Sequence, residues 1–291
     1  MKRREFLSVV AAVPALGLPS SASSLQTAAP PGAARKGLKL GTVTYNIAKD
    51  WDLPTLIKNL TDVGMDAVEL RTTHKHGVEI SLPAQARAEV RQAFAASPVK
   101  IGGLGTTCEY HSPDAGVVRK NIDETREWVK LAKDLGSPSV KVRPNGLSKG
   151  VPEEKTLEQI GVSLRECGTF AQEHGVAIQL EVHGAETSRV PRIRKILDYG
   201  GNHPAVKACW NSNQTDLLDG GFEANFKLLK GQIGQVHMRD LFLEEYPWRA
   251  LITNLAAMNF QGYCFAEIPE SADGVRVLRY FKALFRAYEK A

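Results

Sequence analysis

Residues 176–182, Val-Ala-Ile-Gln-Leu-Glu-Val, form a short apolar run, and an amphipathic stretch at 190–199 follows and ends at Gly200-Gly201. A run of this length and composition predicts a buried β-strand, whereas apolar residues at helical spacing closed by glycine predict an α-helix. A strand followed by a helix is the unit from which parallel sheets are built. This stretch therefore predicts a parallel sheet with helices packed outside it.

The same unit repeats eight times after residue 36. The expected strands are 38–45, 67–70, 99–104, 139–143, 176–182, 206–210, 233–238 and 262–267. The expected helices are 53–63, 83–96, 114–135, 152–174, 190–199, 223–229, 248–258 and 274–288. No leftover segment is long enough for a second domain, so residues 37–291 are predicted to form a single α/β domain, a (β/α)₈ TIM barrel.

Glycine motifs give no sign of a nucleotide-binding sheet. The sequence contains neither GxGxxG after the first strand nor GxxxxGK[ST], the patterns that cradle phosphates. Gly102, Gly103 and Gly105 in the third expected strand instead predict close packing against its neighbours. We expect the interiors of the strands to be filled with apolar side chains.

The composition is that of an ordinary soluble globular protein, with 43% hydrophobic and 24% charged residues among 291. The net charge is +5 and aromatic residues make up 7%, but no basic run is interleaved with aromatics, so nucleic acid is not an expected partner. Cys108, Cys167, Cys209 and Cys264 are widely spaced and form no CxxC pair. We interpret them as small buried residues.

The first residues have the parts of an export signal. Lys2-Arg3-Arg4 precedes Phe6-Leu7, an apolar stretch at 9–18 and a run of small residues. This arrangement predicts a twin-arginine-type signal, and the apolar stretch is too short for a stable membrane span. We therefore expect residues 1–36 to be a signal peptide and linker, and the protein to be exported to the periplasm or beyond. The alternative is a basic N-terminus that only resembles a signal.

Polar side chains end the last four expected strands. Glu181, Asn211, His237 and Glu267 stand at these ends in order. Neighbouring parallel strands lie about 4.8 Å apart, so inward side chains at adjacent ends converge, and barrels carry their chemistry at this face. Two carboxylates, an amide oxygen and an imidazole suit a divalent metal such as Mn, Co, Zn or Mg.

These residues resemble the xylose-isomerase-like superfamily of sugar isomerases and epimerases, and the resemblance covers the chain after the linker. It rests on the strand-five Glu, the His-x-x-Asp at 237–240 and the strand-eight Glu. Many members hold a divalent metal with Glu, Asp, His and Glu from strands five to eight, which implies Glu181, His237 and Glu267 as ligands here. Asn211 stands where the family has Asp, and the missing charge should weaken metal binding. The alternative is a metal-free site in which Asn211 and His237 hydrogen-bond to the glutamates.

The resemblance also implies a reaction. The metal would acidify a C–H next to a carbonyl of a small-molecule carbohydrate, and Glu181 and Glu267 would take and return the proton through an enediolate. Isomerisation, epimerisation and elimination share that intermediate, so a 3-keto-glycoside lyase or hydratase remains an alternative. A non-catalytic sugar-binding barrel with a degraded metal site is another. The superfamily's endonuclease branch is disfavoured, because it needs more His and Asp ligands than this chain's seven histidines offer at strand ends. Families of this kind are often homo-oligomers.

Further polar residues near the strand ends are predicted to bind substrate. Alternation on strand four puts Lys141 on the same side as Arg143, which lies nearer the strand end. His74 and His76 lie in the loop after strand two and are expected to be solvated. For Arg143 the alternative is a salt bridge across the barrel mouth, and for Glu69 it is a buried ion pair with a basic neighbour. The predicted substrate-binding residues are His183, Arg143, Arg239, Asp240, Glu69 and His111.

Overall fold

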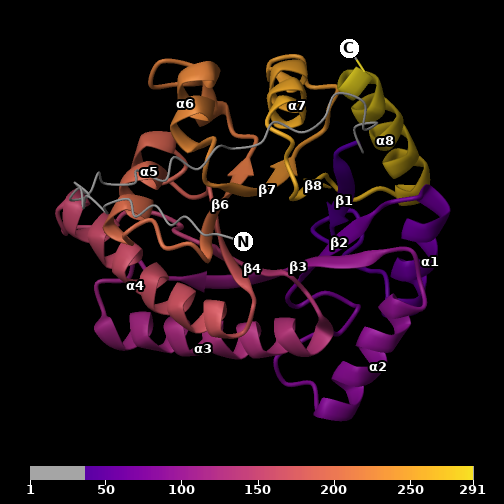
Figure 1. Ribbon diagram of the computed structural model, residues 1–291, viewed down its shortest axis with the longest axis horizontal. Helices are drawn as coiled ribbons and strands as arrows, with labels where there is room; N and C mark the ends of the chain where they lie inside the picture. Colours follow the sequence, from indigo (N-terminus) through magenta and orange to yellow (C-terminus); the bar gives the residue numbers. More distant parts are fainter. Residues whose placement is uncertain (1–36, 291) are drawn as a thin grey trace, which may run out of the picture. The chain divides into compact units, whose positions relative to one another are not determined.

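A computed structural model describes residues 37–290, so the predicted signal peptide and linker at 1–36 lie outside the described residues and stay a prediction. Eight parallel strands pair in chain order and close into a barrel (Figure 1). This confirms the predicted (β/α)₈ TIM barrel. The strands are β1 Lys39–Val43, β2 Ala67–Arg71, β3 Lys100–Glu109, β4 Ser139–Arg143, β5 Ala177–Glu181, β6 Val206–Asn211, β7 Ile233–Met238 and β8 Tyr263–Ala266.

The helices form an outer ring around the strands (Figure 1). They are α1 Leu53–Val63, α2 Ala84–Ala95, α3 Ala115–Leu135, α4 Glu153–Glu173, α5 Val190–Tyr199, α6 Phe222–Leu229, α7 Trp248–Ala257 and α8 Gly274–Lys290, with a short 3₁₀ helix, η1, at Gln214–Leu217. Each predicted helix is present to within two residues at either end. All four cysteines are free and buried, as expected.

Helix α1 shows how local sequence sets these units. The Asp52 carboxylate accepts a hydrogen bond from the Thr55 N–H at 3.0 Å and caps the helix N-terminus. Leu56 and Leu60 lie one turn apart and are buried against the barrel. Gly64 ends the helix at a φ of 73°, a left-handed conformation that glycine adopts without strain. The chain then enters β2 beside β1.

Strand β3 is longer than its sequence predicts, because it continues to Glu109. Gly102 on β3 and Gly41 on β1 make room for Phe265, which is fully buried inside the barrel. A Cβ at Gly102 would lie 2.7 Å from Phe265 Cζ, and one at Gly41 would lie 2.8 Å from the same ring. Gly102 is therefore a position of close packing, as its sequence context predicts.

The barrel interior is more polar than expected. Gln235 Nε2 on β7 donates to Glu69 Oε2 on β2 at 2.6 Å, and Ser139 Oγ on β4 lies 3.4 Å from Gln235 Oε1. These strands are not neighbours in the barrel, so the contacts cross its interior. The expectation of purely apolar strand interiors is wrong at these positions. Buried polar groups survive there because they satisfy one another's hydrogen-bonding groups.

Replacing Phe265 with Ala is expected to lower the free energy of unfolding by about 3–5 kcal/mol, because the glycines around the ring offer no side chain to fill the space. Urea denaturation followed by circular dichroism measures this. Phe242→Ala is the matched control, since Phe242 is 69% exposed and its loss should change little. Equal effects of the two substitutions would contradict the packing role.

Candidate functional site

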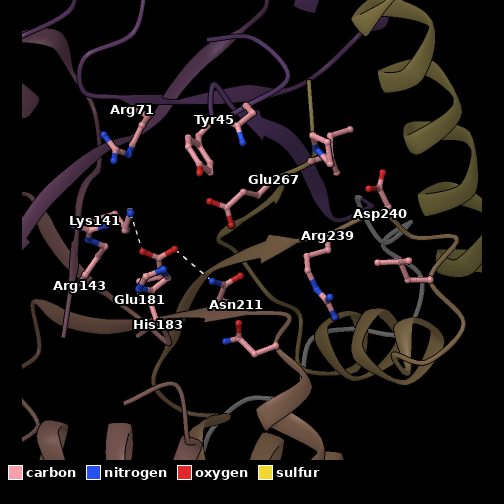
Figure 2. A pocket seen from close by; sticks show the side chains of 15 residues that line it. Tyr45, Arg71, Lys141, Arg143, Glu181, His183, Asn211, Arg239, Asp240 and Glu267 are labelled. Carbon is pink, nitrogen blue, oxygen red and sulfur yellow. Dashed lines mark hydrogen bonds and ion pairs between the residues drawn. The ribbon is translucent and has the colours of Figure 1, made fainter. Parts of the chain in front are cut away.

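A cavity of about 500 Å³ opens at the C-terminal end of the strands (Figure 2). Seven of the eight strands, or the loops that follow them, contribute residues to it, and β3 with its following loop does not. Its walls are formed by Tyr45, Asn46, Arg71, Lys141, Arg143, Glu181, His183, Asn211, Asn213, Arg239, Asp240, Leu243, Glu267, Ile268 and Pro269. Three of the four predicted metal ligands are in this set, and the fourth, His237, lies beneath them.

Glu181 is held in place by a buried ion pair. Lys141 Nζ donates to Glu181 Oε2 at 2.8 Å, and both side chains are at most 5% exposed. On the other side, Asn211 Nδ2 donates to Glu181 Oε1 at 3.4 Å. Burial alone would raise the pKa of Glu181, but the charge of Lys141, together with the hydrogen bond and charge of His237, lowers that pKa well below its ordinary value. The carboxylate is therefore ionised at neutral pH.

His237 is fully buried at the centre of the cluster. Its Nε2 lies 3.1 Å from Glu69 Oε2, while its Nδ1 lies 3.3 Å from Glu181 Oε1 and 3.4 Å from Glu267 Oε2. Burial opposes a charge on the ring, but Cys209, Glu69 and Glu267 raise the pKa of His237 well above its ordinary value. In the metal-free protein the imidazole is therefore protonated at neutral pH.

Glu69 lies beneath His237 and is absent from the cavity wall. Burial would raise its pKa, but the charge of His237 and the hydrogen bond to it lower that pKa below its ordinary value. Of the two roles expected of Glu69, the structure shows the buried pair with a basic neighbour, His237. A carboxylate that contacts one ring nitrogen of a histidine fixes the orientation of the ring, so that the other nitrogen can bind a metal. Here Glu69 contacts Nε2, and Nδ1 faces Glu181 and Glu267.

The residues present fit a divalent metal. His237 Nδ1 is buried without a hydrogen-bond partner, although two carboxylate oxygens face it. Glu181, His237 and Glu267 each offer a ligand atom, and these atoms lie within 4.8 Å of one another. The Asn211 amide stands beside them on Glu181. An imidazole nitrogen surrounded by carboxylate oxygens is a set of ligands that suits a cation such as Zn or Mn.

The remaining predicted residues divide into two groups. His183, Arg143, Arg239 and Asp240 line the cavity, as expected of substrate-binding residues. His111 lies in the loop after β3 and is not in the cavity wall, and its carbonyl accepts a hydrogen bond from Ser148.

Among the charged and aromatic residues of the wall, Tyr45 and Arg71 are not predicted from the sequence, and Lys141 is predicted to face this side without an assigned role. Arg71 lies two residues after Glu69 on β2, so strand alternation points both side chains into the barrel and is the signal that identifies it. Lys141 lies two residues before Arg143 on β4 in the same way. Tyr45 follows β1 and is half-exposed at the cavity mouth, with no sequence pattern that marks it.

The expectation of a solvated His76 is wrong. His76 is only 6% exposed. Its Nε2 lies 3.0 Å from the Arg71 carbonyl oxygen, and its Nδ1 accepts from the Val78 N–H at 3.0 Å. Burial lowers the pKa of His76 to about 4, so the ring is neutral and ties the loop to the end of β2.

The family model of the xylose isomerase-like TIM barrel matches residues 57–284. This is most of the chain, and it includes Glu69, Glu181, His237 and Glu267. The protein belongs to the xylose isomerase-like TIM barrel family. No curated protein sequence matches the chain.

Solved structures with the same fold include several sugar epimerases. A 3-keto-D-glucoside 4-epimerase from E. coli superimposes with a TM-score of 0.72 at 14% identity, covering 86% of this chain and 99% of that one. A D-psicose 3-epimerase superimposes with a TM-score of 0.71 at 14% identity, covering 87% of this chain and 100% of that one. The IolI protein, solved with a bound zinc atom, superimposes with a TM-score of 0.69 at 18% identity, covering 87% of this chain and 98% of that one. Within the part of the chain that the structure describes, no helix is long and apolar enough to cross a membrane.

Substituting Asp for Asn211 is expected to tighten divalent-metal binding about tenfold, because a second anionic oxygen beside Glu181 strengthens the attraction for the cation. Titration calorimetry with Mn²⁺ measures the change. Asn213→Asp is the matched control, since it adds the same charge to the cavity wall on a side chain that bonds to the Val182 carbonyl. An equal gain in both variants would show a general charge effect and would contradict ligation by residue 211.

Proposed function

We propose that this protein is a sugar isomerase or epimerase that removes a proton next to a carbonyl of a keto-sugar, with a divalent metal bound by Glu181, Asn211, His237 and Glu267. One observation carries the proposal: the Glu181 and Glu267 carboxylates lie 3.3 and 3.4 Å from Nδ1 of the buried His237 imidazole at the floor of the cavity. The epimerase activities of structures with this fold support the same class of substrate.

When bound, the metal would polarise the substrate carbonyl and a neighbouring hydroxyl, which acidifies the C–H between them. Glu181 and Glu267 extend from β5 and from the end of β8 toward the same space (Figure 2). One carboxylate takes the proton and the other returns it. Return to the opposite face of the same carbon inverts that centre, and return to the neighbouring carbon moves the carbonyl.

The two carboxylates are not equivalent. Glu181 is paired with Lys141 and buried, whereas the Glu267 side chain is 20% exposed and is not paired with Lys or Arg in residues 37–290. Pairing with Lys141 stabilises the ionised form of Glu181 and reduces its basicity. Glu267 is therefore the better placed of the two to take the first proton from a substrate in the cavity.

Elimination from a 3-keto-glycoside is a second candidate. It uses the same proton abstraction and then expels a substituent from the neighbouring carbon. The cavity volume of about 500 Å³ lies in the range of pockets that hold drug-sized ligands, which leaves room for a group beyond a single sugar ring.

Proton exchange tests the proposed function whichever product the reaction forms. Mn²⁺-loaded protein is incubated in D₂O with keto-hexoses, 3-keto-glucosides and keto-sugar acids, and deuterium next to the carbonyl is followed by NMR. Glu181→Gln and Glu267→Gln should each slow exchange about 10²-fold or more, because each removes an acid–base group.

Glu270→Gln is the matched control for this assay. Glu270 follows β8 closely, its side chain is 66% exposed, and it forms an ion pair with Lys49, so its substitution should leave proton exchange unchanged. Binding of a sugar without exchange by the metal-loaded protein would contradict the proposed function and favour a non-catalytic sugar-binding barrel. Release of the aglycone from a 3-keto-glucoside would assign elimination.

A further inference from the structure

Two arginines stand together on one side of the cavity, away from Asn211 and Glu267. Arg71 ends β2 and Arg143 ends β4, and Figure 2 shows both on the side where Lys141 lies. Strand β3 runs between them, pairing Gly105 with Arg71 and Glu109 with Arg143. Both arginines belong to the cavity wall.

These arginines have few partners within the protein. Arg71 donates to the carbonyl of its neighbour Thr72 at 3.0 Å and lies 5.9 Å from the centre of the Tyr45 ring. No carboxylate among residues 37–290 forms an ion pair with Arg71. Within residues 37–290, Arg143 forms an ion pair only with Glu109, at 3.5 Å, which is longer than a charge-assisted hydrogen bond, and its buried Nε has no partner there. A guanidinium has five N–H donors, so most of these donors remain free.

Two other basic side chains of residues 37–290, Lys141 and Arg192, are paired more closely. Lys141, in the same wall, is satisfied by Glu181 at 2.8 Å. Arg192 on α5 holds Glu153 and Glu186 at 2.8 Å each. Two part-buried arginines without such partners are costly, and burial and the like charge of Arg143 lower the pKa of Arg71. A bound anion would remove that cost.

The backbone of Arg71 is fixed before any ligand binds. Its N–H donates to Thr44 Oγ1 at 3.0 Å, and its carbonyl oxygen lies 3.0 Å from Nε2 of the buried His76. A Cβ at Gly105 would lie 2.7 Å from Glu69 Oε1, so this glycine leaves room for the Glu69 carboxylate, while the Arg71 Cα and Cδ would lie at a contact distance of 3.4 Å. Preorganised donors bind a ligand with less loss of conformational entropy.

We propose that Arg71 and Arg143 form a subsite for an anionic group of the substrate, so that the protein acts on acidic sugars in preference to neutral ones. The inference rests on the proposed function in one respect: the carboxylate–histidine cluster receives the keto-hydroxy end of the same molecule. Guanidinium groups pair with carboxylates and with phosphates through parallel N–H donors. A sugar acid and a sugar phosphate share this chemistry, and the experiment distinguishes them.

Binding of three probes to the full chain tests the proposal. D-glucuronate carries a carboxylate, D-glucuronamide is its neutral amide, and glucose 6-phosphate carries a phosphate. Titration calorimetry is run first on metal-depleted protein and then on the same protein loaded with Mn²⁺. The metal is removed on a chelating resin, because a soluble chelator is itself a polycarboxylate and could occupy the subsite. We expect at least one anion to bind about tenfold or more tightly than the amide, since a charge-assisted pair replaces a neutral contact.

Variants assign the preference to the two arginines. Arg71→Gln and Arg143→Gln should each reduce anion binding about tenfold and leave amide binding unchanged, and Arg71→Lys should keep part of it. Arg276→Gln is the control, because this side chain is 66% exposed on α8. Should the glutamine variants fail to fold, higher salt should weaken anion binding by the wild-type protein and leave amide binding unaffected.

The outcomes separate this proposal from the proposed function. Tighter glucuronate binding assigns a carboxylate, and tighter glucose 6-phosphate binding assigns a phosphate. Equal affinity for glucuronate, its amide and the phosphate, or a preference that survives in both glutamine variants, would overturn the anion subsite. Anion binding to metal-free protein does not depend on catalysis. The protein can therefore bind anions without catalysing proton exchange, and it can catalyse exchange without preferring anions.

Discussion

The contact between Glu69 and His237 is the interaction on which the site depends. It joins β2 to β7 across the barrel at 3.1 Å, and both side chains are fully buried. The barrel must close for these strands to face each other, so the contact exists only in the complete fold. Because Glu69 holds Nε2, the ring presents Nδ1 to Glu181 and Glu267. Gln235 adds a second donor to Glu69 at 2.6 Å and fixes the carboxylate in turn.

Charge is arranged unevenly around this contact. The carboxylates gather at the centre of the cavity floor, where His237 and Lys141 pair with them. Arg71 and Arg143 stand to one side and lack comparable partners in the described chain. Such a division suits a substrate that is itself polar at both ends, with oxygens that a metal can polarise at one end and a negative charge at the other. Binding of the charged end would orient the reacting end over Glu181 and Glu267.

The sequence predicts the barrel and the central site because both follow from local patterns. Hydrophobic periodicity marks each strand and helix, and alternation places Glu181 and His237 inward at strand ends. The extension of β3 over residues 105–109 is not predictable in this way, because glycine has low strand propensity and the role of Gly105 depends on Glu69 from another strand. Three other features depend on neighbours that only the closed barrel supplies: the partner of Glu69, the burial of His76 and the free donors of Arg71.

Titration of Mn²⁺ into metal-depleted protein is the most direct test of the central claim, that the His237 Nδ1 completes a metal site. The raised pKa of His237 means that the metal must displace a proton, so binding should release about one proton at neutral pH and weaken as the pH falls. Calorimetry in two buffers of different ionisation enthalpy measures both quantities. The account predicts one bound metal ion per chain, lost in His237→Ala. Absence of binding at high pH, or binding that survives in that variant, would contradict it.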